Sequence, residues 1–118
     1  MEICGFEIAK KLKEKGFKDI CSHYYRTNSK DLFMVFPCED WNDIKERINA
    51  PTISQVLKWL REEKDLFIQI MFIDKSSYYY EVIDIAADKV KCSVGDYKDS
   101  PELAALAGIE YIIDNNLI

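Results

Sequence analysis

The chain has 118 residues, of which 48% are apolar and 31% charged, a composition typical of a globular protein and not of a disordered one. Its formal net charge of −5 argues against a broadly basic surface for nucleic acid. We expect a single domain over residues 1–118, because a chain of this size buries enough surface to fold without a metal or a disulfide.

The cysteines give an expectation about the compartment. No two of them have the two-residue spacing of a metal or redox motif, and the sequence shows no signal peptide and no apolar run of about 18 residues. Four cysteines would also permit two disulfides in a secreted chain. Without a signal, we expect a cytoplasmic protein with reduced thiols at Cys4, Cys21, Cys38 and Cys92.

The first elements along the chain are a helix and a β-hairpin. Residues Phe6–Lys15 carry apolar side chains one turn apart, which predicts an amphipathic helix. Gly16 followed by Phe17 is typical of a left-handed helix end closed by an apolar contact. Aromatic and β-branched residues around the turn at 27–30 then predict two strands, Ser22–Arg26 and Asp31–Phe36.

A short helix is predicted next, over Glu39–Ile48. Trp41, Ile44 and Ile48 would fall on one side of it, and Asp40 could cap its start.

The best-marked element is a helix that begins at Thr52. Thr52 and Gln55 have the capping-box form, in which the Thr hydroxyl accepts from a backbone N–H and the Gln side chain reaches back to the cap. Apolar residues recur behind this cap at helical spacing, and charged residues occupy the opposite side. The apolar face comprises Ile53, Val56, Leu57 and Leu60, with Trp59 at its edge, and the charged face Lys58, Arg61, Glu62 and Glu63.

A second β-hairpin follows this helix. From Leu66 to Ile73 the period changes to two and both faces are mostly apolar, as in a central strand. Asp74–Ser77 are turn residues, and Tyr78–Ile85 form the returning strand. Lys89–Val94 could add a third strand before a turn over Gly95–Asp99.

The last predicted helix starts at Ser100-Pro101-Glu102, which supplies a cap, a proline in the first turn and an acid at the positive end of the dipole. Leu103, Leu106, Ile109 or Glu110, and Ile113 define its predicted inner side. The middle of this helix carries small residues, namely Ala104, Ala105, Ala107 and Gly108. Gly108 lowers helix stability by roughly 1 kcal/mol relative to alanine, so we expect that its small size allows a close approach by another backbone or a sheet.

Together these elements predict an α+β fold with helices packed on an antiparallel sheet. The predicted order is helix, two strands, short helix, long helix, two or three strands, and helix.

Three segments carry a resemblance to a known group of proteins. They are AKKLKEKGF (Ala9–Phe17), APTISQVLKWLRE (Ala50–Glu62) and YKDSPELAALAGIEYII (Tyr97–Ile113). With the aromatic hairpin between them, they resemble a family of small uncharacterised proteins from phages, prophages and mobile elements of Bacteroidetes-type gut bacteria. In that family the last helix more often contains Glu-Ala-Leu where this chain has Leu103-Ala104. The resemblance implies a phage or mobile-element context and no particular chemistry.

No pattern for catalysis or metal binding stands out. His23 is the only histidine, and Cys21 two residues away gives two potential ligands, which do not make a zinc site. Asp43 and Glu46 share a face of the predicted short helix, where a solvated surface is favoured over a cation site. The glycines are isolated, so no phosphate-binding loop is predicted. We expect no cofactor, no metal and no enzymatic activity, with an unrecognised enzyme as the alternative.

Aromatic residues suggest a possible interaction surface instead, since tryptophan and tyrosine are enriched at binding hot spots. Alternation along the strand directs Tyr79 away from Tyr78 and Tyr80, so at least one of the three should be exposed. The competing interpretation is that these side chains form core and rim. The candidate surface comprises Trp41, Trp59, Tyr78, Tyr79 and Tyr80.

The favoured function is therefore a non-catalytic accessory factor that binds a phage or host protein, with a homodimer as an open possibility. The alternative is a nucleic-acid-binding module, because residues 52–115 have the element order of double-stranded RNA-binding domains. Those domains open their final helix with lysines, whereas this chain has the acidic Asp99-Ser100-Pro101-Glu102. A third hypothesis is an acidic inhibitor that mimics DNA toward a host protein.

Overall fold

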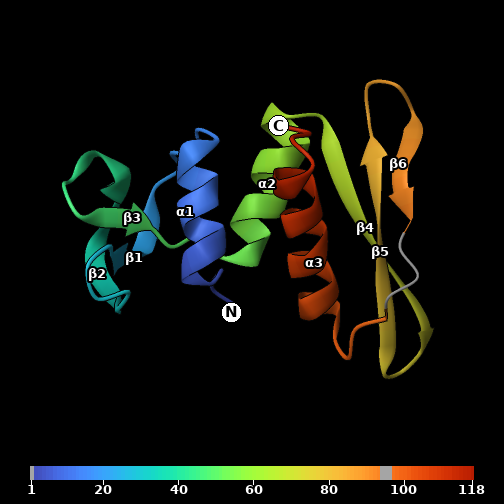
Figure 1. Ribbon diagram of the computed structural model, residues 1–118, viewed down its shortest axis with the longest axis horizontal. Coiled ribbons are helices and arrows are strands. Elements are labelled where there is room, and N and C mark those ends of the chain that lie inside the picture. Colours follow the sequence, from blue (N-terminus) through green and yellow to red (C-terminus); the bar gives the residue numbers. More distant parts are fainter. Residues whose placement is uncertain (1, 94–96) are drawn as a thin grey trace. The chain divides into compact units, whose positions relative to one another are not determined.

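The computed structural model describes residues 2–93 and 97–118, without the side chains of residues 35–37, 43, 92 and 93. Over these residues the predicted α+β class is confirmed (Figure 1): three α-helices pack with two small antiparallel sheets. The six strands form two separate three-stranded sheets and not one continuous sheet. The chain forms two compact units, Met1–Gln55 and Val56–Ile118, each described here by itself. The single domain over residues 1–118 stays a prediction.

The first unit contains one helix and one sheet. The sheet has the strand order β2-β1-β3, with antiparallel pairing throughout. The predicted hairpin is confirmed, since Tyr25 lies opposite Leu32 and His23 opposite Met34. The elements of this unit are α1 (Phe6–Glu14), β1 (Cys21–Arg26), β2 (Leu32–Glu39), the 3-10 turn η1 (Trp41–Asp43) and β3 (Arg47–Asn49).

Helix α1 ends as its sequence predicts. Gly16 has a φ of +92°, a conformation that glycine adopts without a steric penalty. The N–H of Phe17 donates to the carbonyl of Leu12 at 3.0 Å, and the Phe17 side chain is buried. The buried Phe17 side chain and this hydrogen bond close the helix end.

The core of this unit forms between α1 and the strands. The Phe6 ring meets the Tyr25 ring edge-on, with 5.6 Å between their centroids. The Tyr25 hydroxyl donates to the Cys4 carbonyl at 2.7 Å, so the buried phenol keeps a hydrogen-bond partner. The buried cluster comprises Ala9, Tyr25, Ile48 and Ala50, with Ile3 and Phe6 packed against it.

The predicted short helix over Glu39–Ile48 is wrong. Asp40 does act as a cap, accepting from the N–H of Asn42 at 3.1 Å, but only the single turn η1 follows before the chain becomes β3. The buried Asn49 side chain accepts from the N–H of Trp41 and donates to Asp40 at 2.8 Å. This tertiary polar network, together with the burial of β-branched Ile48, overrides the helical spacing of the apolar residues.

The capping box of α2 (Ile53–Glu63) is confirmed in both directions. The Thr52 N–H donates to Gln55 Oε1 at 2.9 Å, and the Gln55 N–H donates to Thr52 Oγ1 at 3.1 Å. Behind this cap, the predicted apolar face contains the buried Ile53, Val56 and Leu60. The boundary between the two units falls within this helix.

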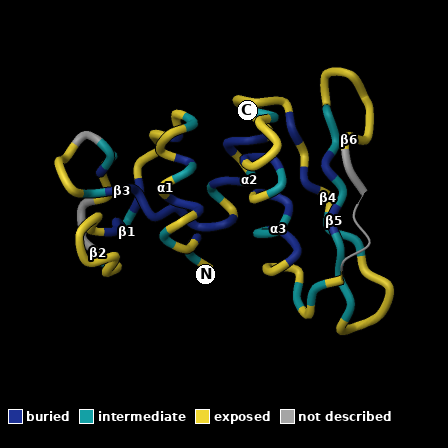
Figure 2. The backbone as a smooth tube through the Cα atoms, viewed as in Figure 1, coloured by how far each residue is buried: buried dark blue, intermediate teal, exposed yellow. Residues whose placement is uncertain are grey.

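The second unit contains the sheet of β4 (Leu66–Asp74), β5 (Ser77–Asp84) and β6 (Lys89–Ser93), covered by α3 (Pro101–Asp114). Its strand order is β4-β5-β6, with β5 in the middle (Figure 1). The hairpin ends of this sheet are exposed (Figure 2). Because β4 is the first strand in the order β4-β5-β6, it is an edge strand among the described residues, although its two apolar faces predicted a central one. Of the predicted turn over Gly95–Asp99, residues 95 and 96 lie outside the described residues, and Lys98 forms an isolated bridge with Tyr78.

Helix α3 lies on the sheet through its small residues. Ser100 Oγ accepts from the N–H of Leu103 at 3.2 Å, which confirms the predicted cap. A Cβ placed on Gly108 would lie 2.9 Å from Ile68 Cγ2 and 3.3 Å from the Tyr80 ring, so the predicted close approach is confirmed. The predicted inner side is wrong at Leu103, which is 48% exposed, because the slim side of the helix faces the sheet.

The close contact at Gly108 makes a prediction about stability. Gly108→Val should lower the free energy of unfolding by about 2–3 kcal/mol, because the added methyl groups overlap Ile68. Ala107→Val is the matched control: it makes a β-branched change one residue away, at a half-buried position, and should cost less than about 1 kcal/mol. Urea unfolding followed by circular dichroism measures both, and equal losses would contradict the close-packing interpretation.

Candidate functional site

The five aromatic residues of the candidate interaction surface differ in their exposure. Trp41, Trp59 and Tyr80 are buried, each exposing 6% of its surface or less. The Trp41 indole N–H donates to the Cys21 carbonyl at 2.7 Å, as expected for a buried tryptophan. Tyr78 and Tyr79 are half-buried and leave β5 on opposite faces. Tyr79 alone of the five lies on the uncovered face of the second sheet.

That uncovered face is set by the register of the strands. Gly108 of α3 contacts Ile68 and Tyr80, so even-numbered residues of β4 and β5 point toward the helix. Odd-numbered residues therefore point away from it. We call this surface the bare face; it comprises Phe67, Gln69, Met71, Tyr79, Glu81, Ile83, Val90 and Tyr97.

Side chains on the bare face form three rows across the strands. In the first row, Ile83 pairs with Phe67 on one side and Val90 on the other; the outer two are 38% and 48% exposed. In the third row, Met71 pairs with Tyr79, whose ring contacts Tyr97 at 5.9 Å between centroids.

The middle row of the bare face is polar. It pairs Gln69 with Glu81, so one carboxylate lies between two apolar rows. Tyr97, at the end of the third row, is 54% exposed. Contiguous exposed apolar side chains on a folded protein mark sites of protein–protein contact more often than isolated ones do. The arrangement suits an apolar partner surface with a basic group at its centre.

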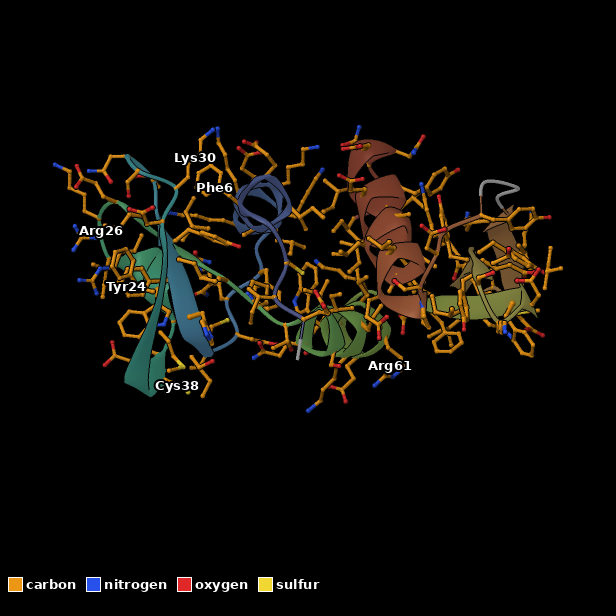
Figure 3. All side chains as sticks on the ribbon, turned by 90° about the horizontal axis from the view of Figure 1, so that it is seen from below. Phe6, Tyr24, Arg26, Lys30, Cys38 and Arg61 are labelled. Carbon is orange, nitrogen blue, oxygen red and sulfur yellow. The ribbon has the colours of Figure 1, made fainter. Side chains whose placement is uncertain are left out.

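A second candidate surface lies in the first unit, where aromatic rings and arginines stack. The Arg47 guanidinium lies 4.5 Å above the Tyr24 ring, and Tyr24 stacks on Phe33 with 5.4 Å between centroids. Arg26 comes from the same strand as Tyr24 (Figure 3). Its guanidinium covers the Phe33 ring at 5.0 Å from the centroid. Each guanidinium is thereby oriented by a ring face, which the interaction of cations with aromatic rings favours.

These two arginines border a surface hollow of about 200 Å³, lined by Arg26, Ile44, Lys45, Glu46 and Arg47. Three cations and one carboxylate give the rim a net positive charge, so an anion could be held there. The buried ring of Tyr24 is covered by Arg47, which leaves little aromatic surface for stacking on a base. The hollow is therefore suited to a phosphate or carboxylate and less to a nucleobase.

The buried thiols lack the properties of catalytic nucleophiles. Burial raises the pKa of Cys4 and of Cys21 from 9.0 to about 12, which keeps both thiols protonated at neutral pH. Cys21 Sγ–H donates to the Asp19 carbonyl at 3.4 Å, while His23 Nδ1 lies 2.8 Å from the Ser22 hydroxyl. Cys21 and His23 thus each have a partner other than the other.

Cys38 is exposed and lies beside a hollow of about 330 Å³. Ile20, Ser22, Thr52 and Gln55 line the rest of that hollow. Gln55 donates to the Ile20 carbonyl at 3.0 Å, so two of these residues already bond to each other.

Acidic side chains show no metal-binding arrangement in the described part of the chain. Over residues 2–93 and 97–118, no three of the histidine, cysteine, aspartate and glutamate side chains described come together as ligands. Asp40, one of the acids of the predicted short helix, instead accepts from Asn42 and Asn49. The side chain of Asp43 lies outside the described residues.

Within the same residues, none of the helices combines the length and the apolarity needed to cross a bilayer.

No protein-family model, no curated protein and no solved structure matches the chain. The resemblance to phage and mobile-element proteins therefore stays a prediction.

Thiol labelling tests the assignment of the cysteines. Because the side chain of Cys92 lies outside the described residues, the test uses the Cys92→Ser variant. At pH 8 a disulfide reagent should label one thiol of the folded protein rapidly, since Cys38 is exposed while burial raises the pKa of Cys4 and Cys21 to about 12. Adding Cys38→Ser should abolish the fast phase, and denaturant should restore two thiols. A fast phase that survives Cys38→Ser would contradict the burial of the other two.

Proposed function

We propose that the protein is a non-catalytic binding module that contacts another protein through the bare face. The observation that carries this proposal is the gathering of exposed apolar side chains on one face of the sheet, opposite the face that α3 covers. An open β-sheet face of this kind exposes apolar surface to water. Burying that surface against a partner stabilises the complex by about 25 cal/mol per Å² of apolar area. The phage or mobile-element context that the sequence resemblance implies makes a host or phage protein the expected partner.

The net charge of the second unit indicates what charge the partner should carry. Residues 56–118 contain seven lysines and arginines against twelve aspartates and glutamates, so this unit carries the whole net charge of −5. Residues 1–55 contain nine of each. Glu81 places one of these carboxylates in the middle row of the bare face. Complementary charge speeds association and selects partners, so the expected partner presents a lysine or arginine flanked by apolar side chains.

A charge reversal tests the proposal. Tagged wild-type protein, Glu81→Lys and the control Glu110→Lys are compared in affinity capture from host lysate treated with nuclease. Glu110 is an exposed residue of α3, so the control makes the same charge change in the same unit away from the bare face. A partner captured by wild type and by Glu110→Lys should be lost with Glu81→Lys, by about tenfold or more in affinity once the partner is purified.

A second pair of variants removes apolar contact instead of charge. Phe67→Ser acts on the bare face, and Leu103→Ser removes a comparably exposed apolar residue from α3. Only the first should weaken capture. Equal capture by all four variants, or a partner that disappears after nuclease treatment, would reject the bare face as the binding surface.

A second candidate function is binding to nucleic acid. Two observations favour it: the element order α2-β4-β5-β6-α3, which is that of double-stranded RNA-binding domains, and the basic hollow of the first unit. The acidic opening of α3 and the charge of −5 on its unit oppose contact there, so the hollow at Arg26 and Arg47 is the expected contact.

Gel-shift measurements at low salt test this candidate. Retardation of RNA or DNA by the wild type should be lost with Arg26→Ala and kept with Lys10→Ala, an exposed cation outside the hollow. An absence of retarded species at low salt would dispose of it.

The acidic second unit also supports a special case of protein binding, in which the partner is a DNA-binding protein and the chain occupies its DNA groove. Competition decides this case: DNA should displace the partner, because both would use the same basic surface. If added DNA does not affect binding of the captured partner, the DNA-mimic case is rejected and the bare-face proposal stands.

A further inference from the structure

The open edge of β4 offers a second interaction surface, and the direction of its backbone groups can be worked out. The Ile85 N–H donates to the Asp65 carbonyl at 2.9 Å, on the β4 side of β5. On the opposite side of β5, Tyr78 and Lys98 exchange two backbone hydrogen bonds, at 2.8 and 2.7 Å. Odd-numbered residues of β5 therefore direct their N–H and C=O groups toward β4, and even-numbered residues direct theirs away.

The same alternation holds in β4 through its register with β5. Phe67, Gln69 and Met71 lie opposite the odd-numbered Ile83, Glu81 and Tyr79, so these pairs are joined by hydrogen bonds. The residues between them direct their backbone groups to the open edge, where no strand of the described chain pairs with them. These edge residues are Leu66, Ile68, Ile70 and Phe72.

Between Leu66 and Phe72 the β4 edge has none of the features that keep edges from pairing. Proteins protect exposed edges with lysines, prolines, bulges within the strand or very short strands. Strand β4 has nine residues, LFIQIMFID, and its only register irregularity lies at the hairpin end, after Phe72. It contains no lysine, arginine, proline or glycine. A sequence typical of a central strand thus occupies an edge position.

A second copy of the chain fits this edge better than an unrelated strand does. Two identical strands that pair antiparallel are related by a two-fold axis perpendicular to the sheet, which keeps each face of the sheet on its own side. Each face stays on its own side only in registers that pair even-numbered residues of one copy with even-numbered residues of the other. The even-numbered residues are also the ones whose backbone N–H and C=O groups point to the open edge. The register centred on Ile70 pairs Ile68 with Phe72 of the other copy, within the regular part of β4.

This register also matches side chains and charges. Phe72, which is 71% exposed, would lie opposite Ile68 of the other copy. Just beyond the strand, Asp65 of each copy would lie near the hairpin turn of the other copy, which contains Lys75. The two-fold axis repeats each of these contacts, so opposite charges meet at both ends of the interface.

We propose that two copies of the protein pair through β4, antiparallel about a two-fold axis at Ile70, and join their sheets into one of six strands. This dimer is independent of the proposed function, because it uses the edge of the sheet and leaves the bare face open. An edge pairing buries modest side-chain area, so we expect a dissociation constant on the order of micromolar.

Hydrogen exchange measured by NMR tests the proposal directly. As protein concentration rises over about a hundredfold, the amides of Ile68, Ile70 and Phe72 should become protected, while those of Phe67, Gln69 and Met71 are protected at every concentration. Sedimentation over the same range should show a monomer–dimer equilibrium. A monomer throughout, or a dimer in which the even-numbered amides exchange freely, would overturn the proposal.

Charge exchange tests the register with little demand on the fold, because Asp65 and Lys75 are exposed. Asp65→Lys or Lys75→Asp alone places like charges together at both ends and should weaken the dimer about fivefold. The double variant Asp65→Lys/Lys75→Asp should restore wild-type association. If the double variant stays as weak as the singles, with unchanged circular dichroism, the register centred on Ile70 is wrong.

Phe72→Pro removes an edge N–H that the monomer does not use, together with an exposed ring, and should abolish the dimer while the monomer stays folded. Leu103→Ser is the control, since it removes an exposed apolar side chain of α3 and should leave association unchanged. A dimer that persists in folded Phe72→Pro would count against the edge.

Discussion

The close contact between Gly108 and the side chains of Ile68 and Tyr80 determines how the second unit is arranged. Because a helix can approach a sheet this closely only through small residues, α3 must turn its Ala104, Ala105 and Gly108 side inward. That choice assigns the even-numbered residues of β4 and β5 to the core and the odd-numbered residues to solvent. Within the second unit, one helix thus covers one face of a three-stranded sheet, and no described element of the same unit covers the opposite face. The bare face is a direct result of this packing and not of any local feature of the strands.

The two candidate surfaces of the second unit differ in the forces that they offer. The bare face presents side chains, so its specificity depends on shape and on the carboxylate of Glu81 between apolar rows. The β4 edge presents backbone groups, whose geometry is the same in any strand, and its specificity depends on register and on the charges that flank it. In the first unit, by contrast, the aromatic rings are occupied by their own arginines. A surface that is already paired within the chain has less to gain from a partner.

Local signals in the sequence predicted local structure well. The capping box at Thr52 and Gln55, the Gly16 helix end and the Ser100 cap each depend on a few neighbouring residues, and all three are confirmed. Long-range packing could not be predicted in the same way. The segment Glu39–Ile48 has helical spacing, but Asn49 and its polar partners, which include Asp19, fix a strand instead. Apolar residues on both faces of β4 predicted a central strand, since periodicity reports which residues are apolar and not how many neighbours the strand has. The alternation of Tyr78, Tyr79 and Tyr80 was correct, whereas only the position of α3 decides which face of β5 is buried.

Residues 2–4 close the first unit by bonding to residues 51–53. Ile3 forms an isolated antiparallel bridge with Thr52, where the Cys4 N–H donates to the Pro51 carbonyl at 2.9 Å and the Ile53 N–H to the Glu2 carbonyl at 3.0 Å. These contacts join residues about half the chain apart, and such long-range closures form late in folding. During synthesis on the ribosome, α1 and the first hairpin must therefore wait for residues 51–53 to emerge before the unit can close. The same contacts secure the start of α2, so shortening the N-terminus by a few residues would free the first turn of a helix that lies some fifty positions away in sequence.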